Sequence, residues 1–302
     1  YLKKKKIKEK DLIILLLSNS ILSALVIFAA AKYGLKLVTI PANSTLLEIN
    51  NAKKEYNPKY IISTDKAVSK NTKLKNKIIY LKNEMIYKNV KRKISKISKK
   101  GYLIVKSSGT TGPSKNICLS FSKLWDSGEN FCKMHDVSSK SVFWNYLPFS
   151  YLGGLFNLLI LPATSASTIL IDRSFNSTML LAFVSTIQNN KISHLWLVPS
   201  ILKSLLILHK HSKIDLRNIG LEKIFIGTAP IDHELKKEFK KKFGIYPLEN
   251  YGLSETTFLS SEMFEDVKSQ KKGYLGNKIR GIKIKVKKEK KNQFGEILVK
   301  TP

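Results

Sequence analysis

The sequence predicts an α/β protein built of layered subdomains with mainly parallel sheets. Two observations predict this class. Short apolar runs typical of buried strands alternate with helical patterns along most of the chain, as in parallel α/β layers. A segment rich in glycine and hydroxyl side chains, residues 107–115, directly follows the apolar run Tyr102–Val105. The end of a strand is where such sheets place their ligands, so this segment is the first candidate for a binding site.

The first strand–helix–strand unit is predicted at the amino end. Residues 12–17 fit a buried parallel strand, 20–32 a helix ended by Gly34, and 35–40 a second strand that ends at Pro41. A membrane span is the alternative for the apolar stretch 12–31, because it is 20 residues long and follows a lysine cluster. The polar triplet 18–20 interrupts that stretch and can cap a helix, which favours the βαβ unit. A signal peptide is not expected, because no small-residue cleavage site follows a compact apolar region.

Further elements follow the same alternation. Strands are predicted at 60–63, 102–105, 142–147, 168–171, 194–198 and 223–226, and helices at 120–134, 177–189 and 232–243. Near the end, Ile282, Ile284 and Val286 alternate with lysines, which predicts a strand with one face in water. Residues 64–100 are polar and rich in lysine, and they predict no organisation beyond short apolar runs.

The formal charge of +31 over 302 residues would fit a nucleic-acid binder or a membrane-surface protein. However, the lysines are spread through the chain, and arginine, the usual reader of phosphates and bases, is scarce. We therefore expect a solvated basic surface with no specific nucleic-acid partner and no transmembrane segment. The two cysteines, Cys118 and Cys132, have neither metal nor disulfide-framework spacing, which indicates a reducing, cytoplasmic setting.

The segment 107–115 reads SSGTTGPSK, a composition suited to holding an anion. Glycines let backbone N–H groups turn inward, hydroxyls donate further hydrogen bonds, and the lysine supplies charge. Ser114 stands where the G-x-x-x-x-G-K-[ST] nucleotide loop needs its second glycine, so the segment is a different phosphate loop. The alternative is a flexible loop that binds nothing.

This segment resembles the signature loop of the adenylate-forming, AMP-binding superfamily, which includes acyl-CoA synthetases, aryl-CoA ligases, luciferases and the adenylation domains of peptide synthetases. The pattern is matched from Ser107 through Gly112 and at Lys115. The sequence departs from it at Ser114, Asn116 and Phe121, where proline, glycine and histidine are usual. By resemblance, the phosphate-binding residues are Ser107, Ser108, Gly109, Thr110, Thr111, Gly112 and Lys115.

Two later segments carry the same resemblance. Residues 227–230 read GTAP and resemble the turn that passes along the adenine, with Thr228 in place of its second glycine. Residues 251–255 read YGLSE and resemble the motif with a tyrosine on the adenine, a hydroxyl near the α-phosphate and a glutamate at the magnesium ion. The resemblance therefore implies cofactor-binding roles for Gly227, Thr228, Ala229, Pro230, Asn250, Tyr251, Gly252 and Ser254, and a metal ligand at Glu255.

The segment 147–156 reads LPFSYLGGLF and resembles the family segment that lines the acyl pocket. From the residues alone, it is equally well a strand-to-helix turn in which the glycine pair allows close approach to the backbone. The resemblance implies that Phe149, Tyr151 and Gly153 belong to the substrate pocket, with Tyr151 where histidine is usual.

The resemblance implies ATP-dependent activation of a small carboxylic acid to an acyl-adenylate, with Mg²⁺ and with transfer to the thiol of CoA or of a carrier protein's pantetheine. The catalytic residues would be Thr110, Lys115 and Glu255. Residues 273–276 and 294–299 resemble the start of the small β-barrel of that family. The chain is expected to be its large amino-terminal domain, truncated at both ends and without the mobile carboxyl-terminal domain. The alternative is a nucleotide-binding remnant that is catalytically incomplete.

Overall fold

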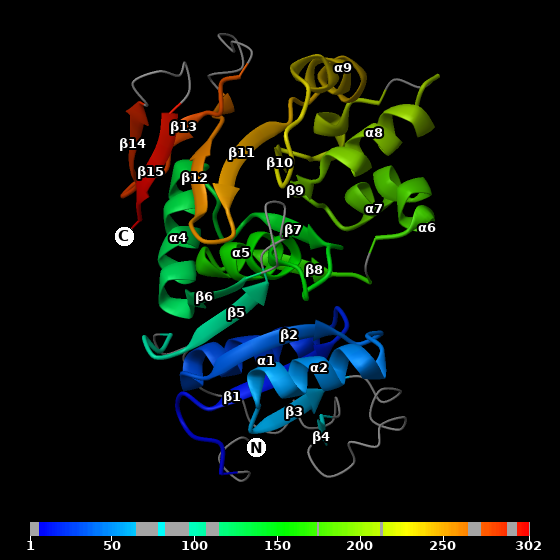
Figure 1. Ribbon diagram of the computed structural model, residues 1–302. Helices are drawn as coiled ribbons and strands as arrows, with labels where there is room; N and C mark the ends of the chain where they lie inside the picture. Colours follow the sequence, from blue (N-terminus) through cyan, green and yellow to red (C-terminus); the bar gives the residue numbers. More distant parts are fainter. Residues whose placement is uncertain are drawn as a thin grey trace.

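The computed structural model describes residues 6–64, 78–81, 97–106, 115–173, 175–211, 214–264, 273–288 and 295–301. Two larger β-sheets with helices against them form the body of the protein, and a two-stranded sheet follows at the carboxyl end. Figure 1 shows the first sheet with α1 and α2 in the lower half and the second sheet with α4 to α9 above it. The predicted class, layered α/β with mainly parallel sheets, is confirmed.

The first sheet has the strand order β4-β3-β1-β2-β5-β6 and is parallel apart from β6. Its elements are β1 Leu12–Leu17, α1 Ile21–Tyr33, β2 Lys36–Pro41, α2 Leu46–Tyr56, β3 Tyr60–Ser63, β4 Ile78–Tyr80, β5 Tyr102–Lys106 and β6 Asn116–Ser120. Strand β1 is central and almost wholly buried, as expected for an apolar run covered on both faces.

The predicted βαβ unit is confirmed with its predicted ends. The Ser20 side chain caps α1 by accepting from the Ser23 backbone N–H, and Gly34 ends the helix at φ +73°. Only a residue without a Cβ adopts that conformation freely. Helix α1 has 13 residues. Within the described part of the chain, no helix combines the length and the apolar character that a membrane crossing requires.

The second sheet has the order β13-β12-β11-β10-β9-β7-β8. Its strands are β7 Val142–Asn145, β8 Thr168–Ile171, β9 His194–Leu197, β10 Lys223–Ile226, β11 Leu248–Leu253, β12 Thr257–Ser261 and β13 Asn277–Lys278. The strands from β8 to β11 are parallel, and β12 and β13 continue the sheet antiparallel. The helices around it are α4 Phe121–Met134, the π-helix η3 Gly153–Ile160, α5 Leu161–Thr164, α6 Ser177–Leu181, α7 Phe183–Asn189, α8 Pro199–Leu208, the 3₁₀ helix η4 Leu216–Ile219 and α9 His233–Phe243.

Two predicted elements are corrected by the structure. The single helix expected at 177–189 is broken at Ala182, so that the exposed turn α6 ends before Phe183 enters the core. The strand expected at 142–147 stops at Asn145, because the chain leaves the sheet there to enter the π-helix region. Strand β6, which pairs antiparallel with β5, was not predicted.

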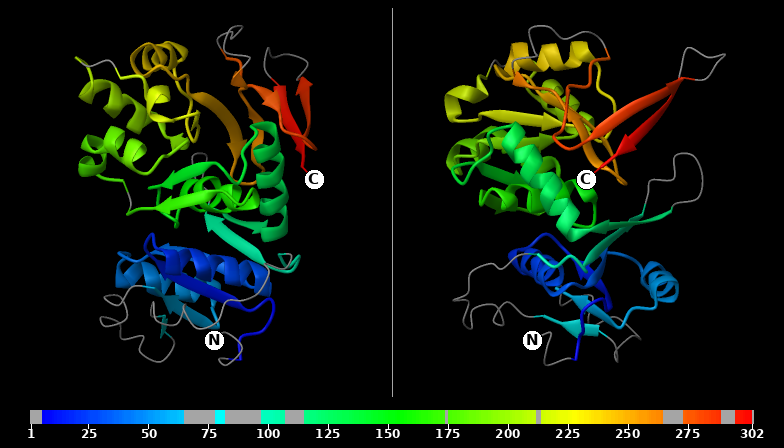
Figure 2. Two further views of the ribbon diagram at one scale, coloured as in Figure 1. Left: turned by 180° about the vertical axis from the view of Figure 1, so that it is seen from behind. Right: turned by 90° about the vertical axis from the view of Figure 1, so that its left-hand side faces the viewer.

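The two-stranded sheet consists of β14 Lys283–Lys288 and β15 Gly295–Lys300, and Figure 2 shows that it projects away from the second sheet. Ile282 is buried as the predicted alternation requires, but Ile284 and Val286 are 40% and 53% exposed. The predicted strand is confirmed as β14, but its expected covered face is wrong, because neither apolar side chain on that face is buried by the described residues.

Candidate functional site

Three segments that the sequence marked separately meet around one cavity of about 300 Å³. They come from the π-helix region, the end of β10 and the β11–β12 hairpin. The predicted residues that line the cavity are Tyr151, Gly153, Gly227, Thr228, Asn250, Gly252 and Ser254. Its remaining wall includes three aromatic residues, Phe156, Trp196 and Phe258. The fold thus brings together residues about 100 positions apart in the chain.

The glycine pair allows the close contacts that the sequence indicated. A Cβ on Gly153 would lie 2.5 Å from Cε1 of the Tyr151 ring, and a Cβ on Gly154 would overlap the carbonyl oxygens of Leu147 and Pro148. The buried Asn145 amide donates to the carbonyl oxygens of Gly154 and Leu158, at 2.9 and 3.0 Å. These contacts hold a π-helix, a conformation that is frequent at functional sites, against the cavity.

Phe149, which the resemblance assigned to the substrate pocket, does not line this cavity. It is wholly buried, and its assignment to the substrate pocket stays a prediction. Its backbone N–H donates to Asn19 Oδ1 at 2.9 Å, and Asn19 Nδ2 donates to the Leu147 carbonyl at 2.9 Å. Asn19 therefore ties the predicted acyl loop to the first sheet. The sequence offered Asn19 only as a possible helix cap, so this role was missed.

The turn after β10 passes the cavity with Gly227 buried and Thr228 exposed. Thr228 has φ +80°, a left-handed conformation that glycine adopts freely and a β-branched residue does not. Thr228, which stands where the resembling motif has its second glycine, thus holds a backbone conformation that suits glycine. Ala229 and Pro230 are exposed and lie outside the cavity wall.

The β11–β12 hairpin carries the YGLSE motif, and its pairing register shifts between Tyr251 and Gly252. A Cβ on Gly252 would overlap the Thr257 carbonyl oxygen, and Thr257 itself has φ +58°. The motif thus requires glycine at this irregularity. Tyr251 is half-buried against the core, and it is not among the residues that line the cavity.

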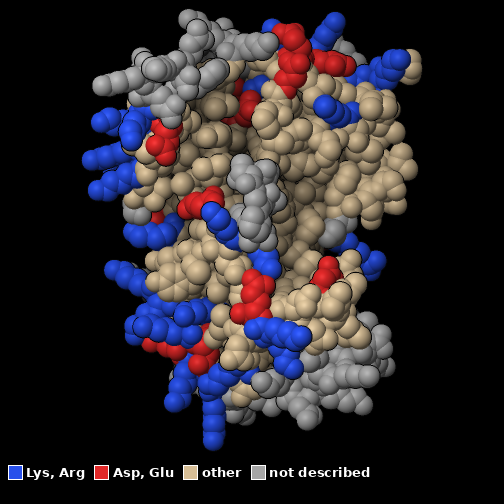
Figure 3. Space-filling model, in the orientation of Figure 1, with Lys and Arg blue, Asp and Glu red and all other residues tan. Residues whose placement is uncertain are grey.

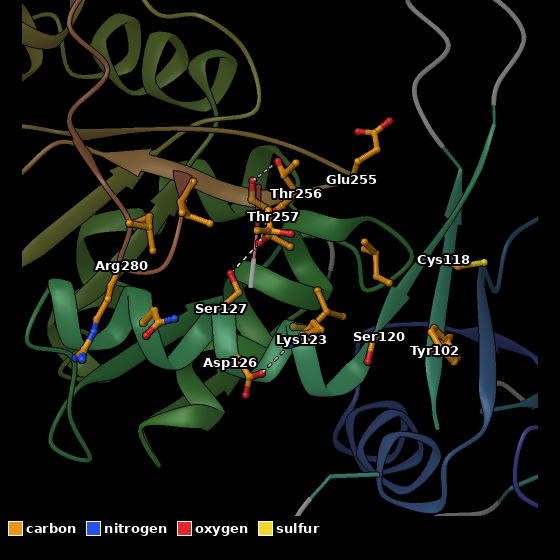
Figure 4. A pocket seen from close by; sticks show the side chains of 16 residues that line it. Tyr102, Cys118, Ser120, Lys123, Asp126, Ser127, Glu255, Thr256, Thr257 and Arg280 are labelled. Carbon is orange, nitrogen blue, oxygen red and sulfur yellow. Dashed lines mark hydrogen bonds and ion pairs between the residues drawn. The ribbon is translucent and has the colours of Figure 1, made fainter. Parts of the chain in front are cut away.

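Glu255 is exposed at the tip of this hairpin, beside a second cavity of about 250 Å³ between α4, β6 and β12. Figure 4 shows the Glu255 carboxylate pointing away from Lys123, Asp126 and the other side chains of that cavity. Neither a hydrogen bond nor an ion pair engages Glu255 within the described residues. Mg²⁺ in nucleotide sites is bound by one or two carboxylates together with substrate phosphates, so a single free carboxylate fits that ion. No cluster of three or more potential metal ligands is present in the described ranges.

The predicted phosphate loop joins two paired strands, since Lys106 at the end of β5 pairs with Asn116 at the start of β6. Lys115 is exposed next to β6. The other residues predicted for this loop, Ser107, Ser108, Gly109, Thr110, Thr111 and Gly112, lie outside the described residues.

Two histidines, His135 and His194, are buried in the protein. Burial, with Lys223 as the next cause, lowers the pKa of His135 to about 3 and that of His194 to about 4. Both pKa values lie below the 6.5 of an ordinary histidine, so both rings are neutral in the folded protein near pH 7.

We expect this burial to make the free energy of unfolding fall as the pH drops from 6.5 toward 4. In this window the unfolded chain binds protons at both histidines and the folded chain does not, so the slope approaches two protons, roughly 2.7 kcal/mol per pH unit. Urea unfolding at several pH values measures the slope. His194→Phe should remove about one proton from it, whereas replacing the exposed His211 by glutamine should leave it unchanged. A stability independent of pH between 4 and 6.5 would contradict the prediction.

The comparison with family models decides the class of the protein. The model described as "AMP-binding enzyme" matches residues 1–302. The chain belongs to the AMP-binding enzyme family. Its match to the Arabidopsis thaliana "4-coumarate--CoA ligase-like 6" is 23% identical over 295 residues and covers 89% of this chain and 51% of that protein. A "2-succinylbenzoate--CoA ligase" of Staphylococcus aureus is 25% identical over 198 residues, covering 65% of this chain and 38% of that protein.

This AMP-binding enzyme chain spans about half the length, or less, of the curated relatives it matches. Solved structures show the same fold at low identity. ATP-bound MatB from Rhodopseudomonas palustris has a TM-score of 0.81 at 17% identity, covering 99% of this chain and 62% of that chain. MenE from Bacillus subtilis, in complex with ATP and a magnesium ion, has a TM-score of 0.77 at 19% identity, with 99% and 62% covered.

Proposed function

We propose that this chain provides the nucleotide and acid sites of an AMP-forming acid–thiol ligase. In this reaction, a carboxylate oxygen attacks the α-phosphorus of ATP, the acyl–phosphate bond forms, and pyrophosphate leaves. A thiol, that of CoA or of a carrier protein's pantetheine, then takes the acyl group and AMP leaves. The carrying observation is the meeting of the 151–153, 227–228 and 250–254 segments at one cavity. The CoA-ligase names of the relatives support the same reaction class.

The nucleotide is assigned to the Gly227 turn and the β11–β12 hairpin. Catalysis would consist of positioning and neutralisation of charge as pyrophosphate departs. In this assignment, Ser107 through Gly112 and Lys115 hold the β- and γ-phosphates, and the Ser254 hydroxyl donates toward the α-phosphate. Tyr251 would lie against the adenine, although it is not part of the present cavity wall. Mg²⁺, held by Glu255, would supply positive charge to the phosphate oxygens.

The acyl group is assigned to the aromatic part of the cavity. Phe258 stacks near Trp196, with ring centroids 5.1 Å apart, and lies 5.3 Å from Phe156. Asn157 on the π-helix is 7% exposed, and its amide has no hydrogen-bond partner within the described ranges. None of the described lining residues is charged. These walls favour an acid whose body is uncharged, with a hydrogen-bonding group that can meet the Asn157 amide.

The surface charge does not compete with this assignment. Figure 3 shows lysines and arginines spread along the left edge and the lower part of that face, with acidic side chains among them. Several lysines are paired, including Lys59 with Asp11 and Lys106 with Glu55, at 2.6 and 2.8 Å. Free thiols at Cys118 and Cys132 fit the reducing, cytoplasmic setting that we propose.

Calorimetry of ATP binding with and without Mg²⁺ tests the proposal. Glu255→Gln should abolish the enhancement of affinity by Mg²⁺ while leaving metal-free binding unchanged, because the amide keeps the shape of the side chain and loses the charge. The control is Glu222→Gln. Glu222 is an exposed acid just before β10, at the end of the strand opposite the Gly227 turn, so this change should leave the Mg²⁺ enhancement intact. Absence of ATP binding by the unaltered chain would refute the proposal, and unchanged Mg²⁺ dependence in E255Q would refute the metal assignment.

A further inference from the structure

The two turns assigned to the nucleotide are joined by one buried side chain. Asn250, next to Tyr251 on β11, donates from Nδ2 to the Ile226 carbonyl at 3.3 Å and to the Leu248 carbonyl at 3.0 Å. Ile226 directly precedes Gly227, and a Cβ on Gly227 would lie 3.1 Å from the Asn250 carbonyl oxygen. The two strands already pair up to Ile226 and Glu249, and the Asn250 amide adds a side-chain link beyond that point, where the Gly227 turn and the hairpin segment at Tyr251 begin.

The hydrogen bonds around Asn250 have a fixed direction. Its Nδ2 faces two carbonyls, which can only accept, so Oδ1 is the atom that faces Ser261 Oγ at 2.6 Å. The single hydrogen of the Ser261 hydroxyl must go to that oxygen. His135 Nε2 lies 2.7 Å from the same hydroxyl oxygen and must therefore carry the hydrogen and donate. The hydrogen bonds thus run in one direction, from the His135 ring to Ser261, then to Asn250 and to the two carbonyls. Hydrogen bonds aligned in this way strengthen one another.

The His135 ring, the first donor of this hydrogen-bond network, is itself held in place. His135 follows the last residue of α4, is 2% exposed, and lies between Phe131 and Phe225, with ring centroids 4.5 and 4.8 Å away. The Lys223 ammonium group on β10 donates to the His135 carbonyl oxygen. Ser261 is wholly buried, and the alternative acceptor for its hydroxyl, the Glu262 carbonyl, is more distant at 3.3 Å.

We propose that His135 and Ser261 are positioning residues, which set the spacing of the two nucleotide turns through Asn250. Neither residue lines the cavity, and both act through the orientation of one amide. The inference rests on the proposed nucleotide site for its ligand, but its structural part concerns the two turns alone. Helix α4 follows β6 and precedes His135. The His135–Ser261 hydrogen bond therefore also links the strand after the predicted phosphate loop to the adenine side of the site.

A second buried histidine–serine pair provides a matched control. Ser193 Oγ lies 2.8 Å from His194 Nδ1, and both residues are buried, but within the described part of the chain this pair has no hydrogen bond to Asn250 or to either turn. Ser261→Ala and Ser193→Ala each remove a hydroxyl from a buried histidine. Both should lower the melting temperature. Only S261A should weaken ATP binding, by about fivefold, which corresponds to the usual net contribution of one hydrogen bond.

Two further measurements separate positioning from stability. Hydrogen–deuterium exchange of the free protein should rise at the amides of 227–230 and 250–254 in S261A and stay unchanged there in S193A. His135→Phe keeps an aromatic ring and removes the donor, so H135F should reproduce the effect of S261A on ATP affinity, and the double variant should add nothing.

If the unaltered chain fails to bind ATP, the proposed function fails, while the exchange comparison still tests this inference. Exchange and affinity that change equally in S261A and S193A, or additive losses in the double variant, would overturn it.

Discussion

Replacing Lys236 by methionine is expected to lower the free energy of unfolding by about 3–5 kcal/mol, the usual cost of removing one partner from a buried ion pair. Lys236 is 2% exposed on α9 and donates to Glu249 at 2.9 Å and to Glu262 at 2.8 Å. The Glu249 backbone N–H also donates to Glu262, at 2.8 Å. Without the ammonium group, two carboxylates share a buried site with no charge to balance them.

The cost of K236M should depend on pH. Burial, with Glu249 adding a like charge, already raises the pKa of Glu262. Loss of the lysine should raise the pKa of Glu262 further. A carboxyl whose pKa is higher in the folded than in the unfolded state stabilises the folded protein at pH values below the unfolded pKa, and this contribution is lost as the pH rises. The destabilisation measured by urea unfolding should therefore be larger at pH 7.5 than at pH 5.

Lys237→Met is the matched control, because Lys237 pairs with Glu234 at 2.8 Å on the exposed side of the same helix. An exposed pair is worth at most about 1 kcal/mol. An equal loss of unfolding free energy in K236M and K237M would show that burial of the Lys236–Glu249–Glu262 group contributes nothing to stability. The triple variant K236M/E249Q/E262Q should recover much of the loss, since it leaves no unbalanced charge.

Elements with a local cause could be predicted from the sequence. The apolar run at 12–17 forms β1. Helix α1 begins after Ser20 and ends at Gly34, and α9 ends at Gly244, which has φ +74°. In each case the side chain or its absence fixes the backbone within one turn. The segments 147–156 and 251–255 were marked by their resemblance to family motifs, and the structure leaves no room for a Cβ at their glycines 153 and 252.

Features that depend on distant partners could not be predicted. Lys236 lies in the run HELKKEFKKKF, in which a buried lysine has the same appearance as an exposed one. The contact of Asn19 with the 147–149 loop spans about 130 positions, and His135 meets Ser261 across 126. Phe149 was placed in the pocket segment by resemblance and is wholly buried, because resemblance to a motif does not say which way a side chain points.

Replacing Gly252 by alanine is expected to disrupt the candidate site more than any other single methyl group added to it. The new Cβ would overlap the Thr257 carbonyl oxygen, a backbone atom that moves only if the β11–β12 hairpin opens. The hairpin carries Ser254 and Glu255, so both would be displaced together. Hydrogen bonds to charged groups are worth about 1.5–3 kcal/mol each, so loss of the contacts from both side chains should lower ATP affinity on the order of 10²-fold.

Gly220→Ala is the control for G252A. Gly220 has φ +95° and no atom within 4 Å of a new Cβ, so alanine there costs only the left-handed backbone conformation, roughly 1–2 kcal/mol. Calorimetry with Mg-ATP and thermal unfolding should separate the two variants. G220A should melt earlier and bind as the unaltered chain does, because η4 and its end at Gly220 do not line the cavity. G252A should lose binding even at temperatures where it is fully folded. Unchanged affinity in folded G252A would mean that the hairpin register at Tyr251 and Gly252 does not place the nucleotide groups, and the site would have to be sought elsewhere.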